Sequence, residues 1–394
     1  MKESAVPEIR QKHPELARAA RDLPPSGIRR FFDIAAKMHD VISLGVGEPD
    51  FVTPWAIREA AIYSLERGQT TYTSNYGMLE LRQAIALHIK NMYGVEYDPE
   101  CEILVTVGVS EALDLAMRAI LDPGDEVVVP EPCYVSYKPC VSLAGGVPAT
   151  VITDASSGFQ LTSADIEPIR THRLKAMLLG YPSNPTGATL PVSVVQDLVD
   201  YADKHNLFIL SDEIYDRLVY DGSHTCVASL PGARDRTILL NGFSKAYAMT
   251  GWRIGYACGP AAVIAAMMKI HSYSILCAPI MGQKAALEAL KSCESSVGDM
   301  VQQYNQRRRL IVEGLNEVGL TCHMPQGAFY AFPSIASTGL SSEEFAERLL
   351  FEQRVAVVPG TAFGAGGEQH IRCSYATSLG NIESALERIK RFLS

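Results

Sequence analysis

The chain has 394 residues, of which 47% are hydrophobic and 20% charged, a composition typical of a folded protein long enough for two domains. Its formal net charge of −9 argues against nucleic acid or an anionic membrane surface as partner, because both bind clustered positive charge. The apolar run at 261–268 is shorter than the roughly 20 residues of a membrane span, so we expect a buried helix segment there.

The spacing of the cysteines and the composition of the N-terminus predict where in the cell the protein is found. The nine cysteines include no CxxC pair, so they predict reduced thiols and no metal site. The first fifteen residues lack the apolar core of a signal peptide. We therefore expect a cytoplasmic protein.

Between about residues 100 and 260, short apolar runs alternate with segments of helical periodicity. Such runs are typical of strands buried on both faces, and their alternation with helices predicts a mostly parallel α/β sheet. The expected strands are 103–107, 126–130, 176–180, 207–212, 237–241 and 253–257, and the clearest helices are 110–121 and 191–205.

The two ends of the chain have a different pattern. A long amphipathic helix is expected at 296–319, followed by short strand-like pieces at 327–334, 355–360 and 370–376, and by a terminal helix at 381–393. We interpret this as a smaller α+β domain assembled from both ends. The predicted division is an N-terminal arm and part of the small domain at 1–50, a large domain at 51–290 and a small C-terminal domain at 291–394.

Polar residues follow the expected strands, and the carboxyl ends of parallel strands meet at one sheet edge, where ligands bind. They form five groups: Gly108 to Ser110, Glu131 with Pro132, Tyr181 to Gly187, Asp212 to Tyr215, and Gly242 to Lys245. Their convergence predicts an active site. The dinucleotide pattern GxGxxG and the P-loop pattern GxxxxGK[ST] are both absent, so neither class of nucleotide is indicated.

Lys245 lies among small and apolar residues directly after one of these strands. A desolvated lysine has a lowered pKa and can form a Schiff base, whereas most lysines extend to water. Ser244 precedes it, and Arg253 follows at the expected start of the next strand. Together the three side chains could hold a phosphate and a carbonyl group.

Several other polar residues each allow two interpretations. Asp212 could cap the following segment or act as a fixed anion beside a protonated ring nitrogen, with Tyr215 directed to the same ligand. Ser110 could be an ordinary helix cap, or the amides around it could bind a phosphate. Asn184 could be only a turn residue. For Arg372, on a half-buried strand, the residues alone favour an internal carboxylate partner over a substrate carboxylate.

Seven segments together resemble the class I/II aminotransferases, the fold-type I enzymes that use pyridoxal 5′-phosphate (PLP). In chain order they read VGEPDF, YTSNYGMLELR, VTVGVSEAL, PSNPTG, SDEIY, NGFSKAYAMTGWRIGY and IRCSYA. The resemblance to this family, which includes aspartate aminotransferase, covers essentially the whole chain. It implies a three-layer α/β sandwich around a mostly parallel seven-stranded sheet.

The resemblance also implies roles for individual residues. Lys245 would hold PLP as an internal aldimine and then move the proton between Cα and C4′, while Asp212 would pair with the pyridinium nitrogen. The remaining cofactor contacts would be Tyr215 and Asn184 at the phenolic oxygen, Tyr134 stacked on the ring, and Val109, Ser110, Ser244 and Arg253 at the phosphate.

Two further implications concern the substrate and a second subunit. Arg372 would hold the substrate α-carboxylate, helped by Asn184 and the backbone of Gly47. Tyr72 would reach the phosphate of a neighbouring subunit, so that a homodimer with shared active sites is expected.

The implied reaction is ping-pong transfer of an amino group between an L-amino acid and a 2-oxo acid, with aspartate, aromatic, alanine or glutamate type donors. Lys269, Arg29 and Arg30 are candidates for recognising a distal acidic group. A PLP-dependent C–S lyase or an eliminating enzyme like aminocyclopropane-carboxylate synthase is the alternative within the fold. A PLP-binding regulatory module is the alternative of another class, disfavoured because fewer than fifty residues precede VGEPDF, without a basic excess.

Overall fold

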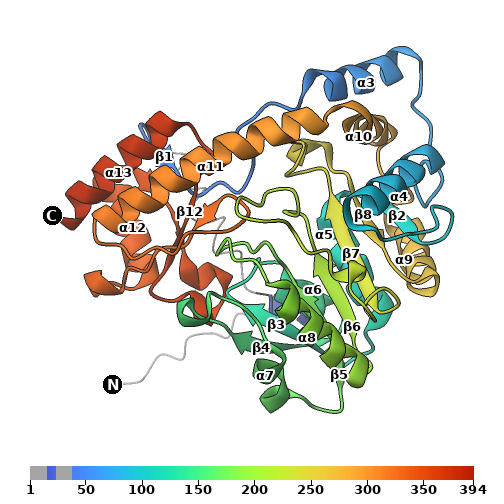
Figure 1. Ribbon diagram of the computed structural model, residues 1–394, viewed down its shortest axis with the longest axis horizontal. Helices are drawn as coiled ribbons and strands as arrows, with labels where there is room; N and C mark the ends of the chain where they lie inside the picture. Colours follow the sequence, from blue (N-terminus) through green and yellow to red (C-terminus); the bar gives the residue numbers. More distant parts are fainter. Residues whose placement is uncertain (1–15, 24–37) are drawn as a thin grey trace, which may run out of the picture.

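The computed structural model describes residues 16–23 and 38–394, and its centre is a seven-stranded sheet (Figure 1). The strand order is β2 (Ile103–Thr106), β8 (Gly255–Cys258), β7 (Thr237–Gly242), β6 (Phe208–Asp212), β5 (Leu174–Leu179), β3 (Glu126–Glu131) and β4 (Val147–Ile152). Neighbouring strands are parallel except at β8, which is antiparallel to β2 and β7. The predicted mostly parallel sheet is confirmed.

All six expected strands form, because their continuous apolar runs are buried on both faces. β4 was not predicted; it is an edge strand in which most residues are partly exposed. One boundary is also wrong. Arg253 was expected to begin a strand, but it has a left-handed backbone (φ 58°) and precedes β8, which begins at Gly255.

Helices cover both faces of the sheet and make the fold a three-layer sandwich. One face is covered by α5 (Gly108–Ile120), α6 (Tyr137–Leu143) and α9 (Ala261–Ser274). The other is covered by α4 (Leu79–Tyr93), α7 (Ser163–Ile166), α8 (Val192–Lys204) and α10 (Ile280–Ser292), with α3 (Trp55–Glu66) packed against α10. α9 contains the expected buried segment, although only one side of it is buried, through Ile264, Met267 and His271.

The C-terminal part packs around its own apolar core. It contains α11 (Glu294–Glu317), α12 (Ser342–Gln353) and α13 (Leu379–Leu393), and a three-stranded sheet of order β11 (Val358–Pro359), β12 (Ile371–Ser374) and β9 (Tyr330–Ala331). From the N-terminal side, β1 (Ile42–Ser43) pairs in parallel with β10 (Val355–Ala356), and Leu44 joins the same core. Both chain ends therefore build the smaller α+β region.

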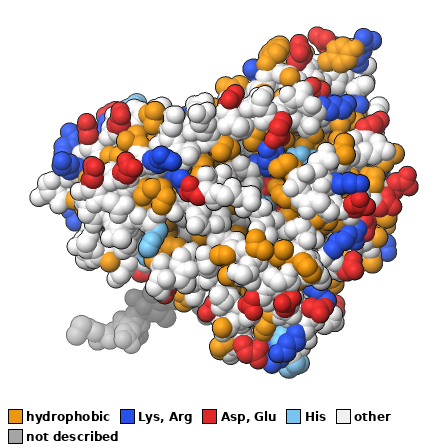
Figure 2. Space-filling model, in the orientation of Figure 1, with side chains coloured by type: hydrophobic (Ala, Val, Ile, Leu, Met, Phe, Trp, Pro, Cys, Tyr) orange, Lys and Arg blue, Asp and Glu red, His pale blue; other side chains and the backbone are white. Residues whose placement is uncertain are grey.

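The surface of the described chain carries charges of both signs. Acidic and basic side chains are interspersed on the face shown in Figure 2. A four-residue helix, α1 (Arg18–Arg21), lies exposed near the N-terminus. Within residues 16–23 and 38–394, none of the helices is both long and apolar enough to cross a membrane. The same residues contain no cluster of His, Cys, Asp or Glu that could hold a metal ion.

Packing between α10 and the segment before β8 predicts a difference between two helical glycines. A Cβ at Gly282 in α10 would lie 2.8 Å from two side-chain atoms of Ile254 and 3.2 Å from the carbonyl oxygen of Trp252, whereas a Cβ at Gly298 in α11 would meet nothing within 4 Å. We expect Gly282→Ala to lower the free energy of unfolding by about 1–2 kcal/mol through overpacking. Gly298→Ala should raise it by up to about 1 kcal/mol, because alanine is the better helix former. Urea unfolding of both variants measures the difference, and equal stabilities would contradict it.

Candidate active site

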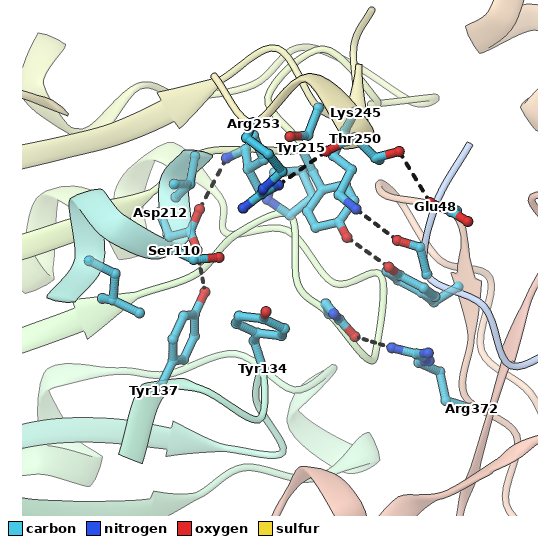
Figure 3. Close-up of a pocket in the computed structure, with 18 of the residues that line it drawn as sticks. Glu48, Ser110, Tyr134, Tyr137, Asp212, Tyr215, Lys245, Thr250, Arg253 and Arg372 are labelled. Carbon is cyan, nitrogen blue, oxygen red and sulfur yellow. Dashed lines mark hydrogen bonds between the residues drawn. The ribbon is translucent and has the colours of Figure 1, made fainter. Parts of the chain in front are cut away.

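A cavity of about 490 Å³ lies at the carboxyl edge of the parallel strands (Figure 3). This is the size and place expected of a small-molecule site in an α/β sheet. It brings together eleven of the residues selected from the sequence: Gly47, Val109, Ser110, Tyr134, Asn184, Asp212, Tyr215, Ser244, Lys245, Arg253 and Arg372. Tyr72 does not line it and is 80% exposed on the surface of this chain.

Lys245 points into this cavity from the turn after β7. Its Nζ donates a hydrogen bond to the carbonyl oxygen of Gly47 at 2.7 Å, and it lies 5.7 Å from the ring centroids of Tyr215 and Phe329. Burial, reinforced by the nearby cation of Arg372, lowers the pKa of the Lys245 amine to about 8. A partly neutral amine at neutral pH is able to act as a nucleophile.

Asp212 is the last residue of β6 and is only 7% exposed. Its Oδ2 accepts a hydrogen bond from the hydroxyl of Tyr137 at 2.9 Å, and its Oδ1 accepts one from the backbone N–H of Ile214 at 3.3 Å. Burial raises the pKa of the Asp212 carboxyl to about 6, while the bond from Tyr137 opposes that rise. Asp212 thus makes the short-range backbone contact expected of a cap and also lines the cavity.

Tyr137 was missed by the sequence reasoning. It lies at the first position of α6, and its ring packs edge-on against Tyr134 at 5.6 Å. A Cβ at Gly180 would lie 2.3 Å from the Tyr137 hydroxyl, so the residue after β5 must be small. The available signal was the second tyrosine in EPCYVSY, three residues after the one selected.

The N-terminus of α5 and Arg253 form a corner suited to an anion. The guanidinium lies so close that a Cβ at Gly108 would be 2.6 Å from Arg253 Nη2, and a Cβ at Gly255 would be 2.6 Å from the backbone nitrogen of Val109. Arg253 bonds to the carbonyl oxygen of Thr250 and has no carboxylate partner within the described chain. Positive charge, helix dipole and exposed amides together favour a phosphate.

Arg372 supplies a second unpaired cation. It is 3% exposed; Nη1 donates to Asn184 Oδ1 at 2.9 Å, and Nη2 donates to the carbonyl oxygen of Gly45 at 2.6 Å. Its Nε is buried without a partner, and burial lowers the pKa of the guanidinium. The expectation that an internal carboxylate pairs with Arg372 is wrong for the described residues, 16–23 and 38–394, in which both of its hydrogen-bond partners are neutral. An isolated guanidinium held by neutral groups is suited to binding a ligand carboxylate.

Three more lining residues carry polar groups that sequence reasoning did not select. The Thr250 hydroxyl donates to Glu48 Oε2 at 3.1 Å, and the hydroxyls of Tyr330 and Tyr215 are 2.7 Å apart. Glu48 and Thr250 lie inside motifs already noted, VGEPDF and AYAMTGW, so proximity to a motif was the available signal. Tyr330 was assigned only to a strand-like piece.

The residues present fit PLP. Arg253 and Arg372 lie on opposite sides of the cavity, as Figure 3 shows, and the first suits a phosphate while the second suits the carboxylate of an amino acid. Lys245 provides an amine for an aldehyde between them, and Asp212 provides a buried carboxylate for a ring nitrogen.

Comparison with known proteins assigns the class and the family. The family model "Aminotransferase class I and II" matches residues 39–389. The chain is 54% identical to "Putative aminotransferase YugH" of Bacillus subtilis (strain 168), over 95% of this chain and 97% of that protein. It is 45% identical to an aspartate aminotransferase of Pyrococcus abyssi, over 94% and 96%. The crystal structure of an aromatic aminotransferase from Pyrococcus horikoshii superimposes with a TM-score of 0.89 at 43% identity, covering 93% of this chain and 98% of that one.

Fold and cavity therefore define a PLP enzyme of fold type I. The chain belongs to the class I and II aminotransferases, and it is a PLP-dependent transaminase. The expected family, fold class and enzyme class are confirmed.

The lowered pKa of Lys245 predicts how cofactor capture depends on pH. In protein stripped of PLP, the rate of capture should rise as the amine loses its proton and level off above about pH 9, because the pKa is about 8. An ordinary lysine, with a pKa of 10.5, would still gain reactivity at about pH 10. Stopped-flow absorbance across this range measures the profile, with Lys245→Ala as the blank. A midpoint near 10.5 would contradict the buried environment.

The bond between Tyr137 and Asp212 predicts the effect of removing a single hydroxyl. Tyr137→Phe should raise the pKa of Asp212 further, because the lost hydrogen bond stabilised the charged carboxylate. The weaker partner for the ring nitrogen should reduce PLP affinity at neutral pH by about five- to tenfold. The matched control is Tyr181→Phe, whose hydroxyl donates only to the carbonyl oxygen of Phe159. Equilibrium titration with PLP distinguishes the two, and equal affinities would argue against a role for Tyr137.

Proposed function

We propose that the protein transfers an amino group between an L-amino acid and a 2-oxo acid by a ping-pong mechanism, with Lys245 as the covalent attachment point of PLP. The observation that carries this proposal is the desolvated Lys245 between two arginines, Arg253 and Arg372, that have no carboxylate partner in the described chain. The relatives named above act on aspartate and on aromatic amino acids according to their names. We therefore propose an aspartate, aromatic, alanine or glutamate type donor.

The chain's own residues would hold the cofactor at each of its polar groups. The amides of Val109 and Ser110, the Ser244 hydroxyl and the Arg253 guanidinium would bind the phosphate. Within the described chain, the Ser244 hydroxyl makes no hydrogen bond to another residue, which leaves it available to a ligand. Tyr134 would stack on the ring.

Asp212 and Tyr215 would set the charge of the ring. With a pKa of about 6, Asp212 is mostly ionised at neutral pH and would keep the ring nitrogen protonated. Burial keeps the pKa of Tyr215 well above its usual value, so its hydroxyl stays protonated and would donate to the phenolic oxygen, beside Asn184. When bound, PLP supplies the electron sink that lets the substrate Cα lose its proton.

Lys245 and Arg372 would act on the substrate. Arg372 would bind the α-carboxylate in two hydrogen bonds, with Asn184 fixing the orientation of its guanidinium. When its amine is free, Lys245 Nζ would accept the proton from the substrate Cα and would return a proton to carbon C4′ of the cofactor. Its pKa of about 8 lies close to neutral pH, as an acid–base catalyst requires. The carbonyl of Gly47 would keep the amine oriented between these steps.

We further propose a cytoplasmic homodimer with shared active sites. The exposed Tyr72 would reach the phosphate of the neighbouring subunit, which is supported by its position outside the cavity of its own chain. Lys269 is exposed on α9 and does not line the cavity, so it is a weak candidate for a distal acidic group. Arg29 and Arg30 lie outside the described residues.

A screen of amino donors against 2-oxo acid acceptors tests the function. Double-reciprocal plots at several acceptor concentrations should give parallel lines, because the two half-reactions share no ternary complex. Lys245→Ala should lower turnover by about 10³-fold or more, whereas Lys269→Ala, a lysine outside the cavity, should retain it. Release of ammonia and pyruvate without any acceptor would instead identify the eliminating enzyme.

A further inference from the structure

Tyr330 lies in β9 under the guanidinium of Arg372. The antiparallel register pairs Tyr330 with Ser374 of β12, so Arg372, two residues before Ser374, lies on the same face of the small sheet. Arg372 Cζ is 4.5 Å from the Tyr330 ring centroid and 4.9 Å from that of Phe363. The guanidinium is therefore in contact with two aromatic rings, and such a contact is strengthened where both partners are desolvated.

The hydroxyl of the same side chain reaches the cofactor side of the cavity. It lies 2.7 Å from the Tyr215 hydroxyl, and Tyr330 is fully buried. A Cβ at Gly47 would lie 2.7 Å from the Tyr330 hydroxyl oxygen, so the residue whose carbonyl accepts from Lys245 must be glycine. Tyr330 thus contacts Arg372, which is proposed to bind the substrate carboxylate, and Tyr215, which is proposed to bind the phenolic oxygen. It also lies close to Gly47, whose carbonyl oxygen accepts a hydrogen bond from the Lys245 amine.

Only one hydrogen can lie between the two hydroxyls, and the ligand determines which tyrosine supplies it. If Tyr215 donates its hydrogen to an anionic ligand oxygen, Tyr330 must be the donor in the bond between them. Accepting this bond polarises the Tyr215 hydroxyl and makes it a stronger donor. The chain of donation then runs from Tyr330 to Tyr215 to the ligand.

We infer that Tyr330 is a positioning residue that couples the two ends of the site: its ring fixes the plane of Arg372, and its hydroxyl directs the hydrogen of Tyr215 to the cofactor. This inference rests on the proposed function, because it takes Arg372 as the carboxylate site and Tyr215 as the partner of the phenolic oxygen. The two halves of the inference can be separated by substitution, since one depends on the ring and the other on the hydroxyl.

Tyr330→Phe removes the hydroxyl and keeps the ring. The visible absorbance of PLP bound to Lys245 should titrate about 0.5 to 1 pH unit higher, because the anionic phenolic oxygen loses part of its stabilisation. The kcat should fall about five- to tenfold while KM stays within about twofold. Calorimetric Kd values for two non-reacting carboxylates, succinate and 3-phenylpropanoate, should also stay within about twofold of the original values.

Tyr330→Leu removes both parts and should add a loss of carboxylate binding. We expect the Kd of whichever carboxylate binds the original protein to weaken by about tenfold, with a matching rise in KM. The control is Tyr375→Phe, which removes a buried hydroxyl from the same apolar core; that hydroxyl donates to the carbonyl oxygen of Ala328 and does not contact the cavity. This control should leave the absorbance titration, kcat and Kd as they are in the original protein.

The outcomes separate this inference from the proposed function. If the unsubstituted protein showed no visible absorbance of PLP bound to Lys245, or no transamination, the proposed function would be overturned. The half of the inference that concerns the Tyr330 hydroxyl would be overturned with it. An active original protein whose absorbance titration is unchanged in Tyr330→Phe, or changed equally in Tyr375→Phe, would overturn only the role of the hydroxyl. Unchanged carboxylate Kd in Tyr330→Leu would overturn the role of the ring, and calorimetry tests this even in protein stripped of PLP.

Discussion

An excess of positive charge in one cavity is the constraint on which the rest of this site depends. Lys245, Arg253 and Arg372 line the cavity, while the carboxylates that line it in the described chain are Asp212 and Glu48, and neither forms an ion pair with these cations. An unpaired charge in a protein interior costs several kcal/mol. This cost applies to the buried guanidinium of Arg372 and to the desolvated amine of Lys245, whereas Arg253 is exposed to solvent. The fold must therefore hold the cations with neutral groups, and anionic groups of the ligands complete the neutralisation.

Backbone carbonyls do most of this holding, and they come from distant parts of the chain. The carbonyls of Gly45 and Gly47, after the N-terminal β1, accept from Arg372 and Lys245, and the carbonyl of Thr250 accepts from Arg253. Carbonyl dipoles stabilise a cation without fixing a counter-charge that would compete with the ligand. This explains why the chain returns its N-terminal segment to the C-terminal region: β1 pairs with β10, and the loop that follows β1 closes one side of the cavity.

Position along the strands made much of this architecture predictable from the sequence. Buried strands appear as continuous apolar runs, and the residues that follow them, such as Asp212 and Lys245, meet at one edge.

Other features could not be predicted in this way. Edge strand β4 was missed because its partly exposed residues do not form a continuous apolar run. Tyr137 and Tyr330 were missed for another reason: each bonds to a partner far away in sequence, 75 and 115 residues respectively, so no local pattern marks them. The carboxylate partner expected for Arg372 was wrong because the usual rule for buried arginines fails where a ligand supplies the anion. The predicted domain boundary at residue 290 stays a prediction, although α11 begins at Glu294.

Desolvation acts on the acid and on the amine of this cavity in opposite directions, and the result suits both roles. Burial is the largest cause of each change: it raises the pKa of Asp212 to about 6 and lowers the pKa of Lys245 to about 8. The two values lie on either side of neutral pH, so the carboxylate is mostly charged while a fraction of the amine is neutral. Water entering the cavity would lower the first value and raise the second. The ring partner would then remain ionised while the reactive amine was lost, so exclusion of water matters more for Lys245 than for Asp212.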